Sequence, residues 1–509
     1  MTNRQRFFIN GIMLSVVGLA IRSVSLALNS FITQNIGAEG VGLFTLVGTV
    51  YSFAVTFATS GISLTVTRTV STALGEGRDD EVRGILRSSI LYSLIFSLFA
   101  TLVLFFGAEY FALRVLSDQR CALPLKILSA SLVPIALSSV FSGYFVGVKR
   151  VARNALVQVL GQVFKISITV GMVLHFAKYG VAVATVALSV SMTLTEISVF
   201  LVALLQFIVD KKRKLRKVRS REGHFHEISA MALPLAVSAY IRSALLTLEH
   251  ILIPKRLRDR GESHGESLSL YGILHGMALP MLLYPMSPLT SFAGLLVPEF
   301  SESLARGERE RMRRIASEAL GVTLCYSIAA MTFVSLFSEE LGYVVYNSFE
   351  AGHYIALMAP VIPIMYLDHV ADSVLKGIGE QVYSMWVNIS DSVLSIVLVW
   401  FLIPRLGIGG YAIVIVVMEG YNFILSASRL YLKVGFRINI VKSVVIPLIS
   451  AFVSATVSKK IFSKCGSMTR PLWLFSEILF AVSIFVGVLF LLSLAQNRLK
   501  SKSTEKPGR

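Results

Sequence analysis

The sequence contains little charge and very few cysteines. Charged residues make up 15% of its 509 residues, against about 25% in soluble domains. The three cysteines, Cys121, Cys325 and Cys465, lie far apart and share no spacing typical of a disulfide framework, a redox pair or a zinc site. These absences exclude a disulfide-stabilised scaffold and a cysteine-ligated metal centre, and we expect neither a metal nor a cofactor.

Catalytic signatures are also missing. The sequence has no Walker A motif, no Gly-x-Ser-x-Gly and no His-Glu-x-x-His. It has no polar region long enough for an ATP-binding domain. We therefore expect a protein that is not an enzyme, whose energy comes from an ion, the membrane potential or the supply of its substrate.

Apolar segments about 20 residues long are abundant instead. Hydrophobic residues make up 54% of the chain, and segments of this length are typical of transmembrane helices. The first segment lacks a small-residue cleavage site, so we interpret it as an uncleaved helix. The sequence predicts an all-α polytopic membrane protein with about fourteen spans: 8–36, 41–66, 88–107, 125–148, 154–176, 181–208, 228–253, 270–297, 315–337, 354–375, 382–403, 410–432, 443–461 and 472–495.

The net charge of +18 is concentrated between these spans. Lys and Arg are most frequent in the loops that lie inside if the N-terminus is inside, above all in residues 211–217. This bias predicts that both termini are cytoplasmic. Anionic phospholipid is the expected partner of the basic loops, and nucleic acid is not.

Several sequence features recur after 220–230 residues. The segment 71–77 resembles 301–307, Pro134 corresponds to Pro363, and Gly180 corresponds to Gly407. An even number of spans per copy predicts two parallel six-helix lobes with a binding site between them near the membrane midplane. The expected division is an N-terminal lobe at 1–209, a basic linker at 210–227, a C-terminal lobe at 228–435, and two further helices with a basic tail at 436–509.

Two arginines occur in the same tripeptide, Ile-Arg-Ser, inside apolar spans. They are Arg22 and Arg242, and an arginine at bilayer depth costs about 2.5–3.5 kcal/mol on insertion scales. Helical spacing places Asn29 on the face of Arg22, and Glu249 on the face of Arg242. The pattern predicts a cationic cavity that binds phosphate or pyrophosphate through the planar guanidinium groups. The alternative is a buried ion pair, between Arg242 and Glu249 or between Arg22 and Asp368.

Other polar residues within the spans are further candidates. Lys165 lies near one helical face with Gln158 and Gln162 and is a candidate for the same cavity. Glu196 and Glu419 lie in corresponding spans, where they could pair with these cations or bind a coupling ion.

Span ten and span eight contain the remaining candidates. Asp368 and Asp372 have helical spacing suited to metal ligands, but pairing with arginine or water explains them better, so they stay ion-coupling candidates. Pro285 and Pro288 predict a bend in span eight, either a gate hinge or a static kink.

Short motifs in spans 1–12 match a known family. They are Ile36-Gly37-Ala38-Glu39-Gly40-Val41-Gly42-Leu43-Phe44, Ser60-Gly61-Ile62, Arg68, Gly143-Tyr144-Phe145-Val146-Gly147 and Tyr179-Gly180-Val181-Ala182-Val183-Ala184. In order and spacing the chain resembles the oligosaccharide flippases of the MOP (multidrug/oligosaccharidyl-lipid/polysaccharide) exporter superfamily, in the branch of the stage V sporulation protein B and the MurJ-type lipid II flippases.

The resemblance implies a V-shaped pair of lobes in the bacterial cytoplasmic membrane that open alternately to either side. The implied cargo is a polyprenyl-pyrophosphate-linked saccharide, such as lipid II or a polysaccharide repeat unit, with H⁺ or Na⁺ as the coupling ion. The family's cavity arginines correspond to Arg22 and Arg242. MurJ-type proteins have a second arginine further along helix one, where this chain reads Leu26-Ala27-Leu28-Asn29. In such relatives the last two helices form a groove for the lipid tail.

The sequence thus favours a flippase in cell-wall or polysaccharide synthesis. The main alternative is a cation-coupled multidrug antiporter of the same superfamily, although span one has no acidic residue to hold a cationic drug. A membrane glycan polymerase or ligase would need a larger outer loop. A scaffold for spore-envelope assembly is the remaining alternative.

Overall fold

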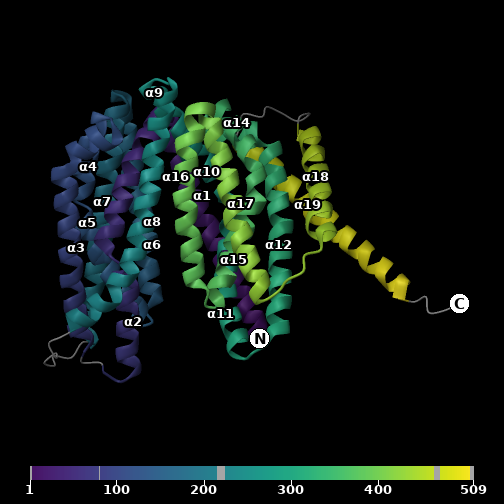
Figure 1. Ribbon diagram of the computed structural model, residues 1–509, viewed down its shortest axis with the longest axis horizontal. Coiled ribbons are helices and arrows are strands. Elements are labelled where there is room, and N and C mark those ends of the chain that lie inside the picture. The colour runs from purple at the N-terminus through teal and green to yellow at the C-terminus, as the bar shows by residue number, and fades with distance from the viewer. Residues whose placement is uncertain (1–2, 79–80, 215–223, 463–470, 505–509) are drawn as a thin grey trace. The chain divides into compact units, whose positions relative to one another are not determined.

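The computed structural model describes residues 3–78, 81–214, 224–462 and 471–504. Every regular element within these ranges is a helix, and none is a strand (Figure 1). Helices suit a lipid environment because each satisfies its own backbone hydrogen bonds. The predicted all-α membrane fold is confirmed.

The number of spans differs from the prediction. Eleven helices in the described part of the chain are long and apolar enough to cross a membrane, or twelve if a pair bent by 43° between residues 119 and 147 is one span. The predicted count of fourteen is therefore not confirmed. The spans expected at 8–36 and 41–66 lie on either side of a kink at Gly37 within α1 (Asn3–Thr59), the second continuing into α2, and the span expected at 472–495 corresponds to a shorter apolar helix at Trp473–Leu489.

The chain forms two compact units built from segments that are distant in the sequence. Unit 1 comprises Met1–Ser30, Ile273–Ser395 and Ile408–Arg509, and unit 2 comprises Phe31–Gly272 and Ile396–Gly407. The first 30 residues therefore belong to the same compact unit as the later helices.

Helix α1 (Asn3–Thr59) contributes to both units. Gly37 interrupts its helical backbone with φ 71° and ψ 175°. A positive φ is accessible to glycine because it has no Cβ atom. The sequence motif around Gly37 thus marks a change of direction within the first long helix.

Unit 2 is a bundle around a continuous apolar core. Ile62, Tyr92, Phe141 and Phe207 belong to this core. Its long helices are α2 (Ile62–Gly75), α3 (Val82–Tyr110), α5 (Leu132–Gly147), α6 (Val151–Phe176), α7 (Val181–Lys214) and α8 (His224–Arg260). Its shorter elements are η1 (Phe111–Leu116), η2 (Gln119–Cys121), α4 (Ala122–Ser129), η3 (Ala177–Tyr179) and α9 (His264–Tyr271).

The outer face of α3 supports a membrane location for this bundle. Large apolar side chains there are exposed, among them Leu98, Phe99, Leu102 and Phe106. A soluble protein rarely leaves such a continuous apolar surface uncovered. Lipid chains are the natural neighbours of this face.

Unit 1 has its own core, which includes Phe300, Leu320, Val370 and Leu430. Its long helices are α11 (Ser287–Ala305), α12 (Arg309–Leu336), α15 (Ile362–Gly377), the first part of α16 (Gln381–Leu406), α17 (Ile408–Lys433), α18 (Ile446–Phe462) and α19 (Pro471–Thr504). Its shorter elements are α10 (Leu279–Leu283), η5 (Tyr284–Met286), α13 (Ser338–Tyr346), α14 (Phe349–Met358), η6 (Ala359–Val361) and η7 (Val441–Val445). The π-helical turn η4 (Gly272–Ala278) begins at the last residue of unit 2.

Both units contain the same close helix crossing. In unit 2, Thr67 Oγ1 of α2 donates to the Gly143 carbonyl of α5 (3.1 Å). In unit 1, Ser301 Oγ of α11 donates to the Gly377 carbonyl of α15 (2.8 Å). The packing itself repeats at an offset of 230 residues: a Cβ atom on Gly147 would lie 3.1 Å from the Thr67 carbonyl oxygen, and one on Gly377 would lie 2.9 Å from the Val297 carbonyl oxygen. A duplicated crossing supports the predicted repeat.

Connecting turns repeat as well. Ser117 and Asn347, which stand 230 positions apart, both adopt a left-handed conformation, with φ 56° and 53°. Lys149 and Gly379 show the same relation, with φ 59° and 84°. The two units therefore share local backbone geometry at positions where side-chain identity has diverged.

Candidate functional site

Span eight is not one regular helix. The segments η4, α10, η5 and α11 follow one another between Gly272 and Ala305. Pro280, Pro285 and Pro288 lie at or near the starts of these segments. Proline lacks a backbone N–H and cannot bond the carbonyl four residues earlier. The predicted bend is thus a set of short breaks with carbonyl groups left for other donors.

Asn29 of α1 binds one of these carbonyls. Its Nδ2 donates to the Gly276 oxygen at 2.7 Å. Gly276 lies four residues before Pro280, so its helical donor is the N–H that proline lacks. Asn29, predicted as a substrate contact, therefore also satisfies a break in span eight.

Arg22 is held at the next break. It is partly buried, and its Nη1 donates to the Leu283 carbonyl oxygen. Its neighbour Ser23 shares a hydrogen bond with the Tyr284 hydroxyl at 2.7 Å. The Ser287 N–H bonds to the Tyr284 oxygen rather than to Leu283. In the 3₁₀ turn η5 the backbone donor to the Leu283 oxygen is the Met286 N–H, three residues later, and Arg22 is a second donor to the same oxygen.

Two tyrosines donate hydrogen bonds to neighbouring backbone carbonyl oxygens. Tyr366 of α15 donates its hydroxyl hydrogen to the Leu282 oxygen at 2.7 Å, and Tyr326 of α12 donates to the Pro285 oxygen at 2.6 Å. Buried carbonyls without donors are costly in an apolar environment. Side chains from three helices therefore stabilise the break at Pro285, and Arg22 is the charged one.

Three acidic residues from different helices interact electrostatically in unit 1. The charges of Asp368 (α15) and Asp391 (α16) both act on Glu419 (α17). Asp372 is instead paired with Lys376 at 2.6 Å, one helical turn along α15. Among the described residues, no group of three or more His, Cys, Asp or Glu has the arrangement of a metal site. The sequence identified Asp368 and Glu419 but missed Asp391.

Arg242 lies in unit 2 and is exposed on α8. The hydroxyl groups on this helix contact the second half of α1. Ser243 Oγ donates to Thr56 Oγ1 (3.3 Å), Thr247 Oγ1 donates to the Thr49 carbonyl (3.2 Å), and the Tyr240 hydroxyl shares a hydrogen bond with Ser60. No proline breaks residues 49–59 of α1.

Glu249 lies two turns beyond Arg242 and is buried, with 8% of its surface exposed. Its charge acts on the buried Tyr271, whose hydroxyl also contacts Nδ1 of His250 at 3.0 Å. These polar groups from the second half of α8 and from α9 are thus close together inside unit 2.

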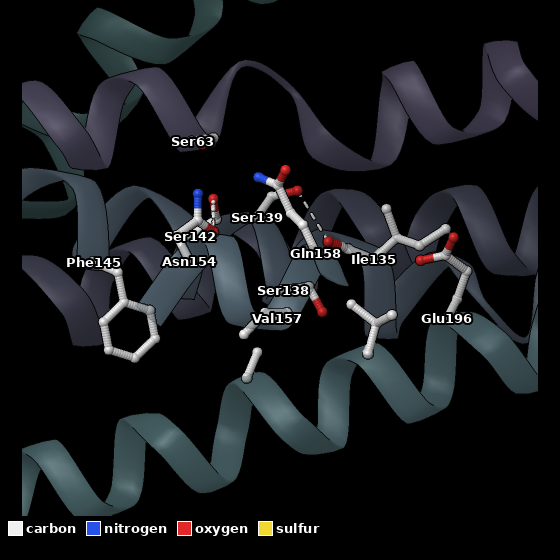
Figure 2. Close-up of a pocket in the computed structure, with 12 residues that line it drawn as sticks. Ser63, Ile135, Ser138, Ser139, Ser142, Phe145, Asn154, Val157, Gln158 and Glu196 are labelled. Carbon is white, nitrogen blue, oxygen red and sulfur yellow. Dashed lines mark hydrogen bonds between the residues drawn. The ribbon is translucent and has the colours of Figure 1, made fainter. Parts of the chain in front are cut away.

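A hydroxyl-lined cavity of about 230 Å³ lies inside unit 2. Figure 2 shows Glu196 at one end of the group of lining side chains and Asn154 with Phe145 towards the other. Ser142 Oγ donates to Asn154 Oδ1 at 2.9 Å. Its other polar lining residues are Ser63, Ser138, Ser139 and Gln158.

Lys165 is exposed, and its charge acts on Glu196. The structure thus brings these two predicted residues into electrostatic contact. The sequence missed the cavity serines, although Ser138, Ser139 and Ser142 have the spacing of one helical face.

A charged cluster outside the spans was also missed. Asp118 accepts hydrogen bonds from the Arg120 side chain (2.8 Å from Nη2) and contacts Nε2 of His264 at 2.7 Å. Arg120 also bonds Glu39 at 2.8 Å. Burial opposes the ionisation of Asp118, but the hydrogen bonds from Arg120 and His264 outweigh it and hold its pKa below the ordinary value. The cluster ties α9 and the part of α1 just after Gly37 to the loop before α4.

Comparison with known proteins agrees with this geometry. Residues 8–304 match the family model described as polysaccharide biosynthesis protein, and residues 275–401 match the MatE model. The stage V sporulation protein B of Bacillus subtilis (strain 168) is 26% identical over 420 residues, which cover 81% of this chain and 81% of that protein.

Two solved structures share the fold. The lipid II flippase MurJ, in an inward closed conformation, has a TM-score of 0.70 with 13% identity, covering 95% of this chain and 100% of that one. An inward-facing multidrug resistance MATE family transporter of the MOP superfamily has a TM-score of 0.66 with 15% identity, covering 82% of this chain and 98% of that one. These families and relatives are transporters and flippases rather than enzymes, as expected. The resemblance to the MOP superfamily is confirmed, and the chain belongs to the polysaccharide biosynthesis protein family.

Proposed function

We propose that the protein is a flippase that moves a polyprenyl-pyrophosphate-linked saccharide across the bacterial cytoplasmic membrane by alternating access. The observation that carries this proposal is Arg22, an intramembrane arginine held at a proline break in a chain of the polysaccharide biosynthesis family. One relative of the same fold, MurJ, is named a lipid II flippase. A cell-wall or polysaccharide precursor is the corresponding cargo here.

Arg22 and Arg242 supply the chemistry for an anionic headgroup. A guanidinium donates two parallel hydrogen bonds to phosphate oxygens, and such charge-assisted bonds are about twice as strong as neutral ones. The Arg22 side chain donates through Nη1 to Leu283, and its remaining guanidinium N–H groups are proposed to bind an oxyanion. Asn29, Lys165 and Glu249 are proposed further contacts to the headgroup or its sugars.

A coupling ion, H⁺ or Na⁺, is part of this proposal. Asp368, Asp391 and Glu419 provide interacting carboxylates in unit 1, and Glu196 provides one beside a hydroxyl-lined cavity in unit 2. Buried carboxylates of this kind are suited to binding a proton or a small cation. Asp372 stays a weaker proposal because Lys376 already neutralises it.

The topology proposed from the charge pattern places both termini in the cytoplasm, with the basic residues 211–217 near anionic lipid; residues 215–217 lie outside the described residues. The sequence boundaries at 209, 228 and 435 remain the proposed limits of the two copies. Pro285 and Pro288 are proposed to form a bend at which span eight changes conformation when the cargo binds and the transporter opens or closes.

Flipping by the purified protein in liposomes tests the proposal. The accessible headgroup of an undecaprenyl-pyrophosphate glycolipid would be measured over time for wild type, Arg22→Ala and Arg242→Ala. We expect wild type to flip it and Arg22→Ala to slow flipping at limiting cargo by about 10-fold or more, the value of one or more charge-assisted hydrogen bonds. Arg306→Ala, which removes an exposed arginine paired with Glu302, is the matched control.

Equal flipping by wild type and both arginine variants would contradict the role of the arginines. No flipping by wild type would contradict the flippase itself. The MatE match over residues 275–401 favours a cation-coupled multidrug antiporter as the second candidate. That function requires efflux of a cationic drug driven by a proton or sodium gradient, which the same liposomes can report.

A further inference from the structure

The hydroxyl-lined cavity of unit 2 combines neutral hydrogen-bonding groups with an apolar wall. Its volume is about 230 Å³, and of the twelve described residues that line it Glu196 alone is charged. The charge of Lys165 acts on that carboxylate. A phosphate or pyrophosphate would have no cationic partner among these lining residues. The cavity is suited instead to an uncharged ligand with several hydroxyl groups.

Ser138 lines this cavity with a hydroxyl group that the protein itself does not satisfy. Its Oγ atom is buried and has no hydrogen-bond partner among the residues that the structure describes. Ser139 and Ser142, by contrast, donate to the Ile135 carbonyl (3.0 Å) and to Asn154 Oδ1 (2.9 Å). A buried hydroxyl without a partner costs free energy. A ligand hydroxyl that bonds to Ser138 would therefore be stabilising.

Helix α6 contributes polar residues to the cavity from the side opposite its apolar surface. Asn154 and Gln158 line the cavity one helical turn apart, and Gln158 is exposed. Leu156, Val159 and Val163 are exposed on the other side of the helix. That apolar side is typical of a surface covered by lipid chains. A hydrophilic ligand can therefore reach the cavity past Gln158 without crossing the apolar side.

The lining groups match the surface of a sugar ring. Such a ring has hydroxyl groups around its edge and C–H groups on its two faces, so it needs polar and apolar contacts together. Figure 2 shows the Phe145 ring towards one end of the lining groups and Glu196 at the other, with Ser138, Ser139 and Ser142 between them. An aromatic face carries partial negative charge and attracts C–H groups. Serine hydroxyls donate and accept hydrogen bonds, and an ionised carboxylate accepts them.

We propose that this cavity binds one uncharged sugar residue of the cargo, with Ser138 as a direct hydrogen-bond partner. The inference rests on the proposed flippase function, because it assigns a site to the saccharide part of the proposed cargo. Arg22 and Arg242 are proposed to bind the pyrophosphate, whereas the cavity of unit 2 recognises the sugar. The affinity that a sugar adds to a lipid pyrophosphate is therefore the quantity that depends on this cavity.

Matched probes measure that added affinity on the full-length protein in detergent. Isothermal titration would compare farnesyl pyrophosphate that carries glucose or N-acetylglucosamine on its terminal phosphate with the methyl ester of the same charge. We expect at least one sugar to strengthen binding to wild type about 10-fold or more, the value of two or three hydrogen bonds. Ser138→Ala should reduce this gain about 3–10-fold and leave the affinity for the methyl ester unchanged.

Thermal unfolding separates this role of Ser138 from a structural one. Ser138→Ala removes a buried hydroxyl that has no partner among the described residues, so it should leave the unfolding midpoint unchanged or raise it. Ser198→Ala is the matched control, because Ser198 lies on α7 outside the cavity lining and donates to the Leu194 carbonyl of its own helix at 2.8 Å. It should leave the gain from the sugar unchanged.

An equal gain in wild type and Ser138→Ala would overturn the inference, as would a gain that falls only together with the unfolding midpoint. A gain that sodium chloride abolishes and choline chloride does not would show that the cavity binds a cation instead. If the methyl ester binds and neither sugar adds affinity, the sugar site alone fails. If the glycosylated probes bind and the methyl ester does not, the sugar site stands and the pyrophosphate role of the arginines fails. If wild type binds none of the probes, the proposed function fails together with this inference.

Discussion

The two units contain the same turn with opposite charges. The Arg150 N–H bonds to the Phe145 carbonyl in unit 2 (2.8 Å), and the Glu380 N–H bonds to the Leu375 carbonyl in unit 1 (2.9 Å). Arg150 and Arg153 pair with Asp210 at the end of α7. Duplication therefore preserved the backbone of this turn and its tie to a neighbouring helix, but not the sign of the charges.

In unit 1 the acid lies on the turn and the bases lie on the helix. Glu380 pairs with Arg429 at 2.8 Å and with Lys433 at 2.7 Å, both near the end of α17. Hydrogen bonds from Lys433 and then Arg429 hold the pKa of Glu380 below its ordinary value. Asp210, by contrast, is fully buried and also accepts a hydrogen bond from the Tyr144 hydroxyl at 2.8 Å. Both units therefore have an ion pair between this turn and a neighbouring helix, but the acidic residue is buried in unit 2 and partly exposed in unit 1.

Neutralising Asp210 should change the unfolding midpoint more than any other substitution in this comparison. In Asp210→Asn the buried side chain has no negative charge, so the positive charges of Arg150 and Arg153 are no longer neutralised. Breaking a buried ion pair in this way costs about 3–5 kcal/mol. Thermal unfolding of the purified protein in detergent should show a clearly lower midpoint for this variant.

Glu380→Gln is the matched variant in unit 1. Because solvent reaches Glu380, its loss should lower the midpoint much less than the loss of Asp210. Equal midpoint changes for the two variants would show that burial does not distinguish the two ion-pair groups. The comparison would then be reduced to a simple exchange of charge signs.

The repeated helix crossing offers a second, smaller contrast. A Cβ atom on Gly143 would lie 2.5 Å from the Ser63 carbonyl oxygen, and one on Gly377 would lie 2.9 Å from the Val297 oxygen. Overpacking of this kind costs about 1–3 kcal/mol. We expect both Gly143→Ala and Gly377→Ala to lower the unfolding midpoint, Gly143→Ala by more.

Gly294→Ala is the control for this pair, since a Cβ atom there has no neighbour within 4 Å. It should leave the midpoint unchanged or raise it slightly, because alanine is the better helix former. If Gly143→Ala behaves like Gly294→Ala, α2 and α5 do not pack closely in the folded protein.

The fold was predictable because apolar length and charge placement are imposed by lipid along the whole chain. The repeat was predictable from short turns such as Gly180 and Gly407, both of which adopt positive φ. The unit boundaries were not predictable in this way. Whether the start of α1 packs with early or late helices depends on tertiary contacts such as Asn29 with Gly276, for which the sequence has no local signal.

The candidate site was predictable only in part. Arg22 and Arg242 have matching sequence surroundings, but Arg22 meets a proline-broken helix and Arg242 lies on a helix that contacts an unbroken segment. The prolines were visible in the sequence, whereas their pairing with Arg22 was not. Asp391 and the cavity serines were missed because single polar residues in a span are common. They indicate a site only when the fold places several of them close together, and the sequence does not show this.

The smallest expected effect concerns a capping residue that titrates in one unit only. Asp118 and Ser348, 230 positions apart, follow the left-handed residues Ser117 and Asn347. The side chain of Asp118 accepts the Arg120 N–H at 2.9 Å, and Ser348 Oγ accepts the Ala351 N–H at 3.1 Å. Both therefore cap the next helical turn, but only the aspartate can lose its charge.

Acid should therefore weaken unit 2 at this turn and leave the matching turn of unit 1 unaffected. The lowered pKa of Asp118 means that its stabilising contribution is complete above the ordinary value of 3.8 and is lost as the pH falls through the lowered value. We expect part of the acid-induced fall in unfolding midpoint below pH 3.8 to be absent in Asp118→Ser, which copies the cap of unit 1. Ser348→Asp is the reciprocal variant, and it lacks the His264 partner. An identical acid response in wild type and Asp118→Ser would show that this ion cluster does not stabilise unit 2, and the two caps would then be equivalent in energy as well as in geometry.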